Sequence, residues 1–416
     1  MSVQKLTLAE VRKAVEGTAA AFRCRRRLQP AGGPGDKVFP PTYKDKESEK
    51  VVYAVEKRRI PGRNEPVTCV LLDSVQSQAN RMELALQEAV DAGRIKLPLV
   101  VVDFSEFDPT GDIEADKAAG RLIEKVGRIT SLQVPHRLAD AILRDSELDG
   151  VKFRRSERGK ALNTASLANA TPLFELCPTA LVFGMWDSTG PKRTLGPKFE
   201  RAIVSEIVGI GAQWEDSYRN RGVRRDPLEI SKNVPVFRDE YWALQRVAEP
   251  GEKNAIAPSK INHSNVLFEL SNSGVTIEYA EQTTTLSLIC LRRLRFPLNG
   301  KTDPEVDAAA QTVLAVLGLT AATLAFEAGM DLRSRCLLWP DGPMVWELLD
   351  RPGEEPRRFS LTGDAAVELL KNAVEAARQK GLPWPDEPLV LKPSEELVKL
   401  VQRSQLQRAS ETVEVD

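Results

Sequence analysis

The apolar positions of this chain recur either every second residue or every third to fourth residue, which predicts strands that alternate with helices. The clearest example is the short apolar run Val67–Leu72, which predicts a buried strand. Asp73 then provides a capping oxygen, and Gln76, three residues on, can return the hydrogen bond at a helix start. Gly93 is a suitable end for this helix. Its apolar face comprises Val75, Ala79, Met82, Leu86 and Val90.

The first two turns of this predicted helix carry uncharged hydrogen-bonding side chains beside one cation. They are Ser74, Gln76, Ser77, Gln78, Asn80 and Arg81. The amino-terminal end of a helix has a partial positive charge and free N–H groups, so it suits a phosphate or a backbone carbonyl. A well-capped helix start in contact with solvent explains the same residues equally well. The pattern alone therefore leaves both interpretations open.

Similar patterns predict the rest of the fold. We expect an α+β fold, because strands first alternate with helices and then pair as hairpins. A closing strand near the end would place Arg333 and Arg335 on one face. The predicted helices are Leu8–Ala21, 306–328 and Asp364–Lys380, and the predicted strands are Phe22–Leu28, Leu97–Phe104, Thr179–Trp186, two strands within Gly274–Phe296, and Asp331–Pro340.

Two stretches break these patterns and are interpreted as insertions. One, at about 43–66, is charged and resembles a hairpin, and the other, at about 187–265, is rich in loops and prolines. We expect one domain over 1–385 that contains both insertions. The remaining residues, 386–416, are expected to form a C-terminal helix or a tail.

Cationic residues are grouped locally, although the whole chain has a formal net charge of −1. No global field therefore attracts a polyanion. The predicted strand Phe22–Leu28 has Arg23, Arg25 and Arg27 at alternate positions, which gives one of its faces a largely cationic character. Such a face can contribute to a nucleic-acid groove, although basic clusters are more often solvated surfaces.

The composition argues against several classes of site. The five cysteines are widely spaced without a CxxC pair, which excludes a zinc ribbon, and only His136 and His263 could supply imidazole. We therefore expect no metal and no cofactor. An odd number of cysteines without a signal peptide indicates a cytoplasmic protein. The uncharged stretch Ala308–Phe326 is long enough for a membrane span, but its alanines, threonines and acidic flanks favour a buried helix, so no membrane partner is expected.

Five separated blocks of this sequence, in consistent order, resemble one protein family. The family is the CRISPR-associated RAMP protein that builds the backbone of type I-U (also called I-G) Cascade complexes. The blocks are long and idiosyncratic, which makes the resemblance specific. They are RLQPAGGPGDKVFPPTY (Arg27–Tyr43), LLDSVQSQANRME (71–83), LGPKFERAIVSEIVG (Leu195–Gly209), PSKINHSN (Pro258–Asn265) and DLRSRCLLWP (Asp331–Pro340).

The resemblance implies a modified RRM or ferredoxin-like palm with large insertions, one of them a thumb-like hairpin. It also implies a non-catalytic subunit whose copies polymerise along the spacer part of a CRISPR RNA (crRNA). Each copy would hold the sugar-phosphate backbone and leave the bases free to pair with target DNA, as in other RNA-guided systems. The implied partners are crRNA, target DNA through the crRNA, further copies of this chain, and other Cascade subunits.

Within these blocks and beside them, the residue types suit RNA. Arginine and lysine neutralise phosphates, and serine, glutamine and asparagine can reach phosphate and 2′-OH groups. The aromatic pattern of ordinary RRM proteins is absent, so base-specific stacking is not expected. Arg333 and Arg335 could equally form ion pairs inside the fold. The predicted RNA-binding residues are Arg25, Arg27, Ser74, Gln76, Gln78, Asn80, Arg81, Lys260, Asn262, His263, Arg333 and Arg335.

Two alternatives compete with this scaffold. The first is a RAMP-type endoribonuclease, for which Asp73, Asp187 and His263 are the candidate catalytic residues. Asp73 is more simply explained as a helix cap, and no paired carboxylates or nucleophile motif accompany it. The second is a metabolic α/β enzyme, which would require a cofactor fingerprint that the sequence lacks.

Overall fold

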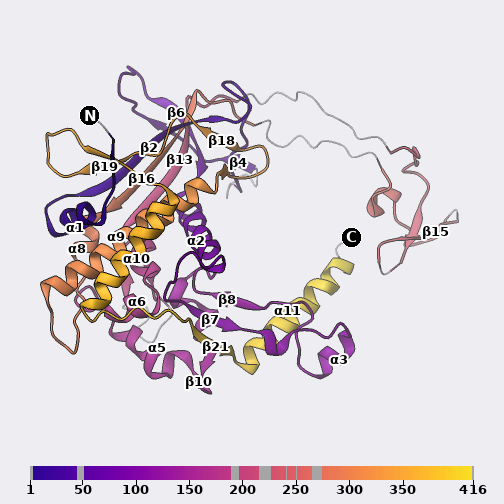
Figure 1. The fold of residues 1–416 in the computed structure, drawn as a ribbon. Helices are drawn as coiled ribbons and strands as arrows, with labels where there is room; N and C mark the ends of the chain where they lie inside the picture. The colour runs from indigo at the N-terminus through magenta and orange to yellow at the C-terminus, as the bar shows by residue number, and fades with distance from the viewer. Residues whose placement is uncertain are drawn as a thin grey trace.

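The computed structural model describes most of the chain and contains one large and one smaller mixed sheet (Figure 1). The predicted α+β class is confirmed. Parts of both predicted insertions and the motif residues Leu195 and Asn265 lie outside the described residues. The described ranges are 3–44, 51–188, 196–214, 226–239, 241–249, 251–264 and 274–414.

The large sheet has an antiparallel centre in the order β19-β2-β16-β13-β6, extended by β20 and β1 on one side and by β5 on the other. A short hairpin, β17–β18, joins it through β2. The strands are β1 (Gln4–Lys5), β2 (Ala21–Pro30), β5 (Val55–Arg58), β6 (Val67–Asp73), β13 (Ile203–Ile210), β16 (Tyr279–Ser287), β17 (Met330–Asp331), β18 (Leu337–Pro340), β19 (Trp346–Leu349) and β20 (Arg357–Ser360).

The connections at the centre of this sheet follow a βαββαβ path. Helix α2 (Val75–Asp91) lies between β2 and β13, and helix α9 (Pro304–Glu327) lies between β16 and β19. The strand order β19-β2-β16-β13 is that of a ferredoxin-like fold, in which the fourth strand flanks the first. An additional strand, β6, comes between β2 and α2 in the sequence. It pairs with β13 on the side away from β16.

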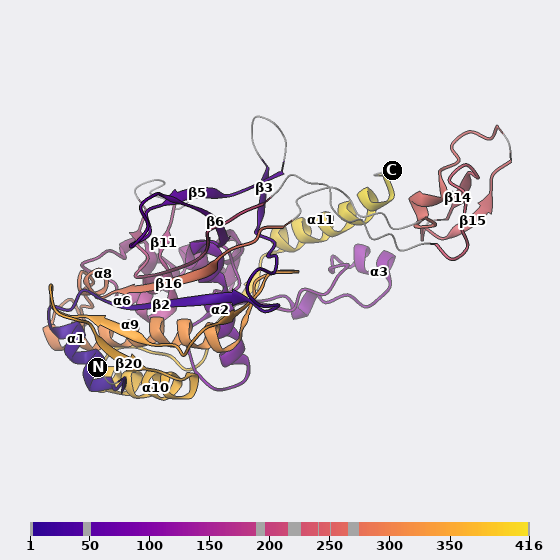
Figure 2. The same ribbon diagram turned by 90° about the horizontal axis from the view of Figure 1, so that it is seen from above.

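Helices cover one face of the large sheet. The helices α1 (Leu8–Glu16), α9 and α10 (Gly363–Gln379) lie on the same side of β2 (Figure 2). Helix α9 is buried on nearly all sides, from Val306 to Leu324. It is long and apolar enough to cross a membrane, but 89% of its most apolar window is buried inside the protein. It is therefore a buried core helix, as its alanines and threonines predict.

The smaller sheet has the order β10-β9-β21-β7-β8. The segment after 385 is built into it, because β21 pairs in parallel with β7 before α11 begins. The division of the chain at 385 stays a prediction. The strands of the smaller sheet are β7 (Val100–Asp103), β8 (Arg128–Thr130), β9 (Ser146–Leu148), β10 (Val151–Lys152) and β21 (Leu389–Pro393). The helices that precede or follow these strands in the sequence are α3 (Ile113–Ala118), α4 (Ala141–Arg144), α5 (Glu157–Ala161), α6 (Thr171–Leu176) and α11 (Glu395–Glu414).

Three hairpins complete the described chain. The hairpin β14–β15 is drawn well away from both sheets (Figures 1 and 2). The hairpin β3–β4 falls in the first predicted insertion. The hairpin β11–β12 comes after β10 and before β13 in the sequence. Their strands are β3 (Thr42–Lys44), β4 (Val51–Tyr53), β11 (Met185–Trp186), β12 (Lys198–Phe199), β14 (Val236–Arg238) and β15 (Leu244–Val247).

Four predicted strands are wrong in part. Most of the run at 179–186 is helix α7 (Thr179–Phe183), because a short apolar run has no period that distinguishes a buried helix from a buried strand. The two strands predicted within 274–296 are β16 followed by helix α8 (Leu288–Arg292), whose start Ser287 caps. The predicted closing strand is interrupted by the turn between β17 and β18.

The first helix is shorter than predicted. It ends at Glu16, and Gly17 donates its backbone N–H to the Lys13 carbonyl at the C-cap. Strand β2 then begins at Ala21, one residue before its predicted start. A glycine at this point favours the helix end, which the period of apolar residues alone did not locate.

Candidate nucleic-acid interface

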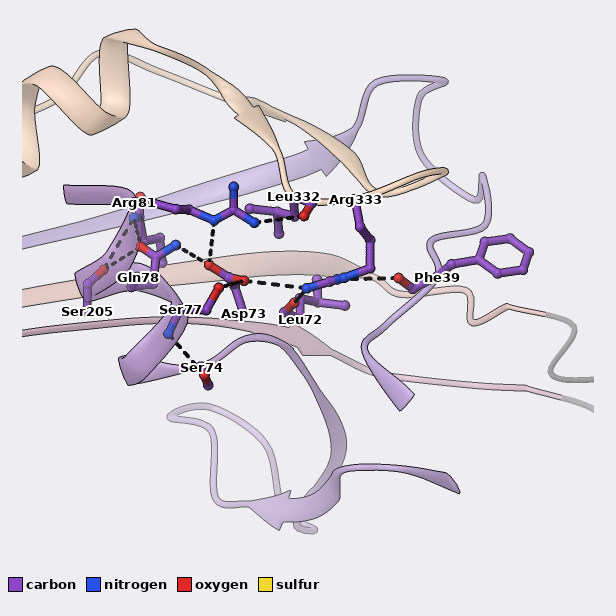
Figure 3. Close-up of polar contacts among 11 residues, drawn as sticks. Phe39, Leu72, Asp73, Ser74, Ser77, Gln78, Arg81, Ser205, Leu332 and Arg333 are labelled. Carbon is purple, nitrogen blue, oxygen red and sulfur yellow. Dashed lines mark hydrogen bonds and ion pairs between the residues drawn. The ribbon is translucent and has the colours of Figure 1, made fainter. Parts of the chain in front are cut away.

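Asp73, the last residue of β6, organises the start of α2. Its side chain is buried and accepts hydrogen bonds from Ser77 Oγ at 2.8 Å, Gln78 Nε2 at 2.6 Å and Arg81 Nε at 2.9 Å (Figure 3). Arg333 Nη2 lies 3.4 Å from Asp73 Oδ1, the same carboxylate oxygen that accepts from Ser77. Asp73 therefore holds side chains of α2 and of the distant β17–β18 hairpin together.

The cap of α2 is Ser74, and the prediction that Asp73 caps this helix is wrong. Ser74 Oγ accepts a hydrogen bond from the Ser77 N–H at 3.2 Å. Asp73 precedes the cap and points its carboxylate to side chains instead. The first turn of α2 contains no acidic residue of its own, and Gln76 and Asn80 are exposed near this partly positive helix end.

Arg81 and Arg333 give this helix end an excess of positive charge. Arg81 Nη2 donates to the Leu332 carbonyl at 2.7 Å, and Arg333 Nη2 donates to the Leu72 carbonyl at 2.7 Å (Figure 3). Their side chains stay 30% and 27% exposed, while the Asp73 side chain is fully buried. Two fixed cations thus share one buried anion, and one positive charge is left for a ligand at the surface.

Gln78 belongs to the interior. It is 3% exposed, and its Oε1 accepts hydrogen bonds from Ser205 Oγ at 2.9 Å and Gln282 Nε2 at 2.7 Å. The amide of Gln78 is engaged inside the protein in this conformation, and its predicted contact with RNA stays a prediction. Its role is to connect α2 to the inner face of β13 and β16.

Sequence reasoning missed the buried arginine of this network. Arg26 donates to Gln282 Oε1, and its guanidinium carbon lies 3.2 Å from the centre of the Phe326 ring. Its Nη1 has no partner among the described residues. Burial lowers the pKa of Arg26 to about 10. The alternation that places Arg26 on the apolar face with Cys24 and Leu28 was the available signal.

Arg25 and Arg27 lie on the opposite face of β2 from Arg26, as the predicted alternation requires. Arg25 Nη2 lies 2.8 Å from a carboxylate oxygen of Glu281 on the neighbouring strand. The Arg27 guanidinium lies over the Tyr279 ring at 3.8 Å. The structure therefore separates these two exposed arginines from the cluster around Asp73.

Arg335 lies in the turn of the β17–β18 hairpin and is exposed. Its φ angle is +59°, and its guanidinium lies 4.1 Å from the centre of the Phe39 ring. The turn is closed by the Cys336 N–H, which donates to the Arg333 carbonyl at 2.9 Å. The expectation that Arg333 and Arg335 share one face of a strand is wrong, because the chain reverses between them.

Lys260, Asn262 and His263 do not join this cluster. They follow or belong to the short 3₁₀ turn Pro258–Ile261, in the segment that also contains β14 and β15. Asn262 adopts a left-handed φ of +61°. This segment is drawn apart from the large sheet (Figures 1 and 2). RNA binding by these three residues stays a prediction.

The candidate catalytic residues occupy structural positions. The Asp187 side chain is 2% exposed and pairs with Arg154 at 2.5 Å, and Asp73 is held as described above. His263 follows the 3₁₀ turn Pro258–Ile261, in the segment that also contains β14 and β15. Among the residues that the structure describes, no group of three or more histidine, cysteine or acidic side chains could hold a metal ion.

In a comparison with known proteins, one family model matches part of the chain. Residues 22–214 match the model of the family described as CRISPR-associated protein GSU0053. The matched segment runs from β2 through the start of α2 to Trp214, so it contains Asp73 and Arg81 but not Arg333. No curated protein matches the chain. The family match supports a CRISPR-associated protein with a role in CRISPR defence.

Proposed function

We propose that this chain is the non-catalytic, crRNA-binding backbone subunit of a type I CRISPR interference (Cascade) complex. Its type I-G (I-U) assignment rests on the five motif blocks, and its role in CRISPR defence rests on the family match. The observation that carries RNA binding is the pair Arg81 and Arg333, which share the single buried carboxylate of Asp73 at the start of α2.

A phosphate is the ligand that this helix end suits best. The exposed Gln76 and Asn80 can donate hydrogen bonds, the helix end carries a partial positive charge, and the two arginines are already fixed by backbone carbonyls. Contacts of these groups to a phosphate carry no information on the base. A subunit that must accept any spacer needs this kind of recognition, because base pairing then reads the sequence.

The segment with β14 and β15 supports assembly with further copies or other subunits. Among its described residues only Val236 and Ile261 are buried hydrophobics. A module with so few buried apolar side chains gains little stability from its own core. Its exposed large hydrophobic residues are Leu228, Val234, Tyr241, Leu244 and Val247.

The absence of catalysis is also part of the proposal. Asp73 and Asp187 are both engaged by arginines, so neither carboxylate is open to a metal ion or a water nucleophile in this conformation. The alternative, that the chain is a ribonuclease, can be tested directly. Cleavage of bound RNA that requires a divalent metal and is lost in Asp73→Ala or Asp187→Ala would overturn the scaffold.

The first experiment is purification from cells with and without a co-expressed CRISPR array. The ultraviolet absorbance ratio and a denaturing gel of the extracted nucleic acid give the readout. A scaffold is expected to retain RNA of regular, protected lengths that dissociates in high salt. Protein that stays free of RNA even with the array and the other subunits present would contradict the proposal.

A further inference from the structure

Strand β18 presents an aromatic ring on the face of the large sheet that the helices leave open. Trp339 is 71% exposed, whereas its neighbour Leu338 is 1% exposed and packs into the inner core. Trp339 lies opposite Gln29 of β2 in the antiparallel register. Its side chain therefore shares the face of Arg25 and Arg27, on the side of β2 away from α1, α9 and α10 (Figure 2).

The Trp339 ring has no aromatic or cationic partner among the described residues. Two half-buried rings elsewhere in the described chain are covered by a cation instead. Arg27 covers Tyr279 at 3.8 Å, and Arg238 covers Trp242 at 3.6 Å. The Trp339 indole is therefore a flat apolar surface that is fixed on a strand and exposed to water. A planar ligand can cover such a surface.

The size and charge of this platform favour a nucleobase over a protein. Its apolar part consists of Trp339 and Leu337, and the latter is 49% exposed. A stable protein interface needs about 20–30 residues on each side, while one base covers one indole. The outward cations of β2, Arg25 and Arg27, lie in the next positions along the strand and suit the phosphates that accompany a base.

The β17–β18 hairpin connects this platform to the phosphate site. Arg333, in the turn of the hairpin, reaches Asp73 on the inner side of the sheet. Trp339 follows on the second strand of the same hairpin and faces outward. An RNA strand held at the turn can therefore pass over the edge of the hairpin and place a base on the indole.

We propose that Trp339 is a stacking platform for a nucleobase of the bound RNA, with Arg27 beside it as the cation for the adjoining phosphate. The inference rests on the proposed RNA-binding function. Stacking on an indole is tolerant of base identity, because every base has a π face. The platform would therefore hold one nucleotide per subunit without restricting the spacer sequence.

The test compares intact and abasic RNA on matched variants. The full chain, freed of nucleic acid in high salt, is titrated with a single-stranded RNA of spacer length and with copies that lack one base at successive positions. Trp339→Ala is expected to weaken binding of the intact RNA roughly 5- to 150-fold, and Trp339→Phe less. Abasic positions that weaken binding to the wild type should have no effect on Trp339→Ala.

Leu400→Ala is the matched control, since it removes an exposed apolar side chain of α11, outside the platform, without removing a ring. Equal binding by wild type and Trp339→Ala, with RNA still bound, would overturn the platform and leave the scaffold standing. A change of oligomeric state in Trp339→Ala without RNA would assign the ring to a protein interface and overturn the platform as well. If the wild type binds no RNA, the proposed function fails and the platform with it.

Discussion

Asp73 and Arg333 are 260 positions apart in the chain and face each other at 3.4 Å where β6 ends. Arg81 approaches the same carboxylate from α2 at 2.9 Å. One buried anion thus joins a strand, a helix and a hairpin. Its removal would leave two guanidinium groups without their shared counterion at the amino-terminal end of a helix, where positive charge is unfavourable.

Asp73→Ala is therefore expected to destabilise the protein strongly. Breaking a buried ion pair from one side costs about 3–5 kcal/mol, because the remaining charges lose their partner. Urea unfolding followed by circular dichroism measures the change. Glu354→Ala is the control, since Glu354 pairs with Arg351 at the surface and such pairs contribute about 0–1 kcal/mol. Similar losses in both variants would contradict the central role of Asp73.

Arg333→Gln is expected to weaken RNA binding at every sequence tested and to reduce the salt slope of binding by about 1. The reason is the loss of one cation that can neutralise a phosphate. Binding measured at several salt concentrations provides both quantities. Arg94→Gln, which removes an arginine beyond the other end of α2, is the matched control. The interface would be misplaced if Arg94→Gln produced the larger effect.

Arg26→Met is expected to leave stability within about 1 kcal/mol of the wild type. The pKa of Arg26 is lowered to about 10, so its charge costs about 3 kcal/mol at neutral pH, and its loss offsets the hydrogen bond lost by Gln282. Since burial lowers the folded pKa below the unfolded value, this cost is constant below about pH 10 and shrinks as the pH rises toward the unfolded pKa.

Arg137→Met provides the contrast for that experiment. Arg137 pairs with Glu83 through two hydrogen bonds of 2.7 and 2.8 Å, and both side chains are buried. Its removal leaves a buried carboxylate alone, which is expected to cost about 3–5 kcal/mol. Equal urea midpoints for the two variants would show that the carboxylate partner does not decide the outcome.

Asp116→Asn is expected to remove part of the acid sensitivity of folding. Burial opposes ionisation of Asp116, but hydrogen bonds from the Thr110 N–H and hydroxyl and from the Gly111 N–H outweigh it and lower its pKa. A lowered pKa contributes stability above the unfolded value near 3.8 that disappears as pH falls through the folded value. Unfolding midpoints between pH 7 and 3 should converge for wild type and variant at the acid end, and parallel curves would contradict this.

Gly274→Ala is expected to disturb the ring beneath Arg335. Gly274 has a φ of +76°, and an added Cβ would lie 2.7 Å from the Phe39 ring. Strain and displacement together are expected to cost about 1–3 kcal/mol. Gly353→Ala is a control with a similar φ and open space around the Cβ. A loss in Gly353→Ala as large as in Gly274→Ala would assign the effect to backbone strain alone.

Long periodic stretches allowed accurate prediction from the sequence. The strand β6 and the apolar stripe of α2 follow from the pattern of apolar residues, and the core helix α9 follows from a long uncharged stretch. The two faces of β2 also follow from alternation, including the outward positions of Arg25 and Arg27. These features were predictable because each depends on neighbours within a few residues in the chain.

Short apolar runs were less informative. Thr179–Phe183 forms a helix and Leu288–Arg292 leaves the strand that precedes it, because caps and tertiary packing decide the conformation of such short segments. The turn before β18 depends on the left-handed backbone of Arg335, for which an arginine in the sequence provides no signal.

The sequence by itself determined where the polar helix start lies, that a buried strand precedes it and that β2 has a cationic face. Only the tertiary structure decided which of these side chains meet. The sheet order places β2 between β16 and the β17–β18 hairpin, and this brings Arg333 to Asp73 while Gln78 turns inward to Gln282. Contacts over such distances in the chain depend on strand order and on the direction of each turn, and local spacing carries neither.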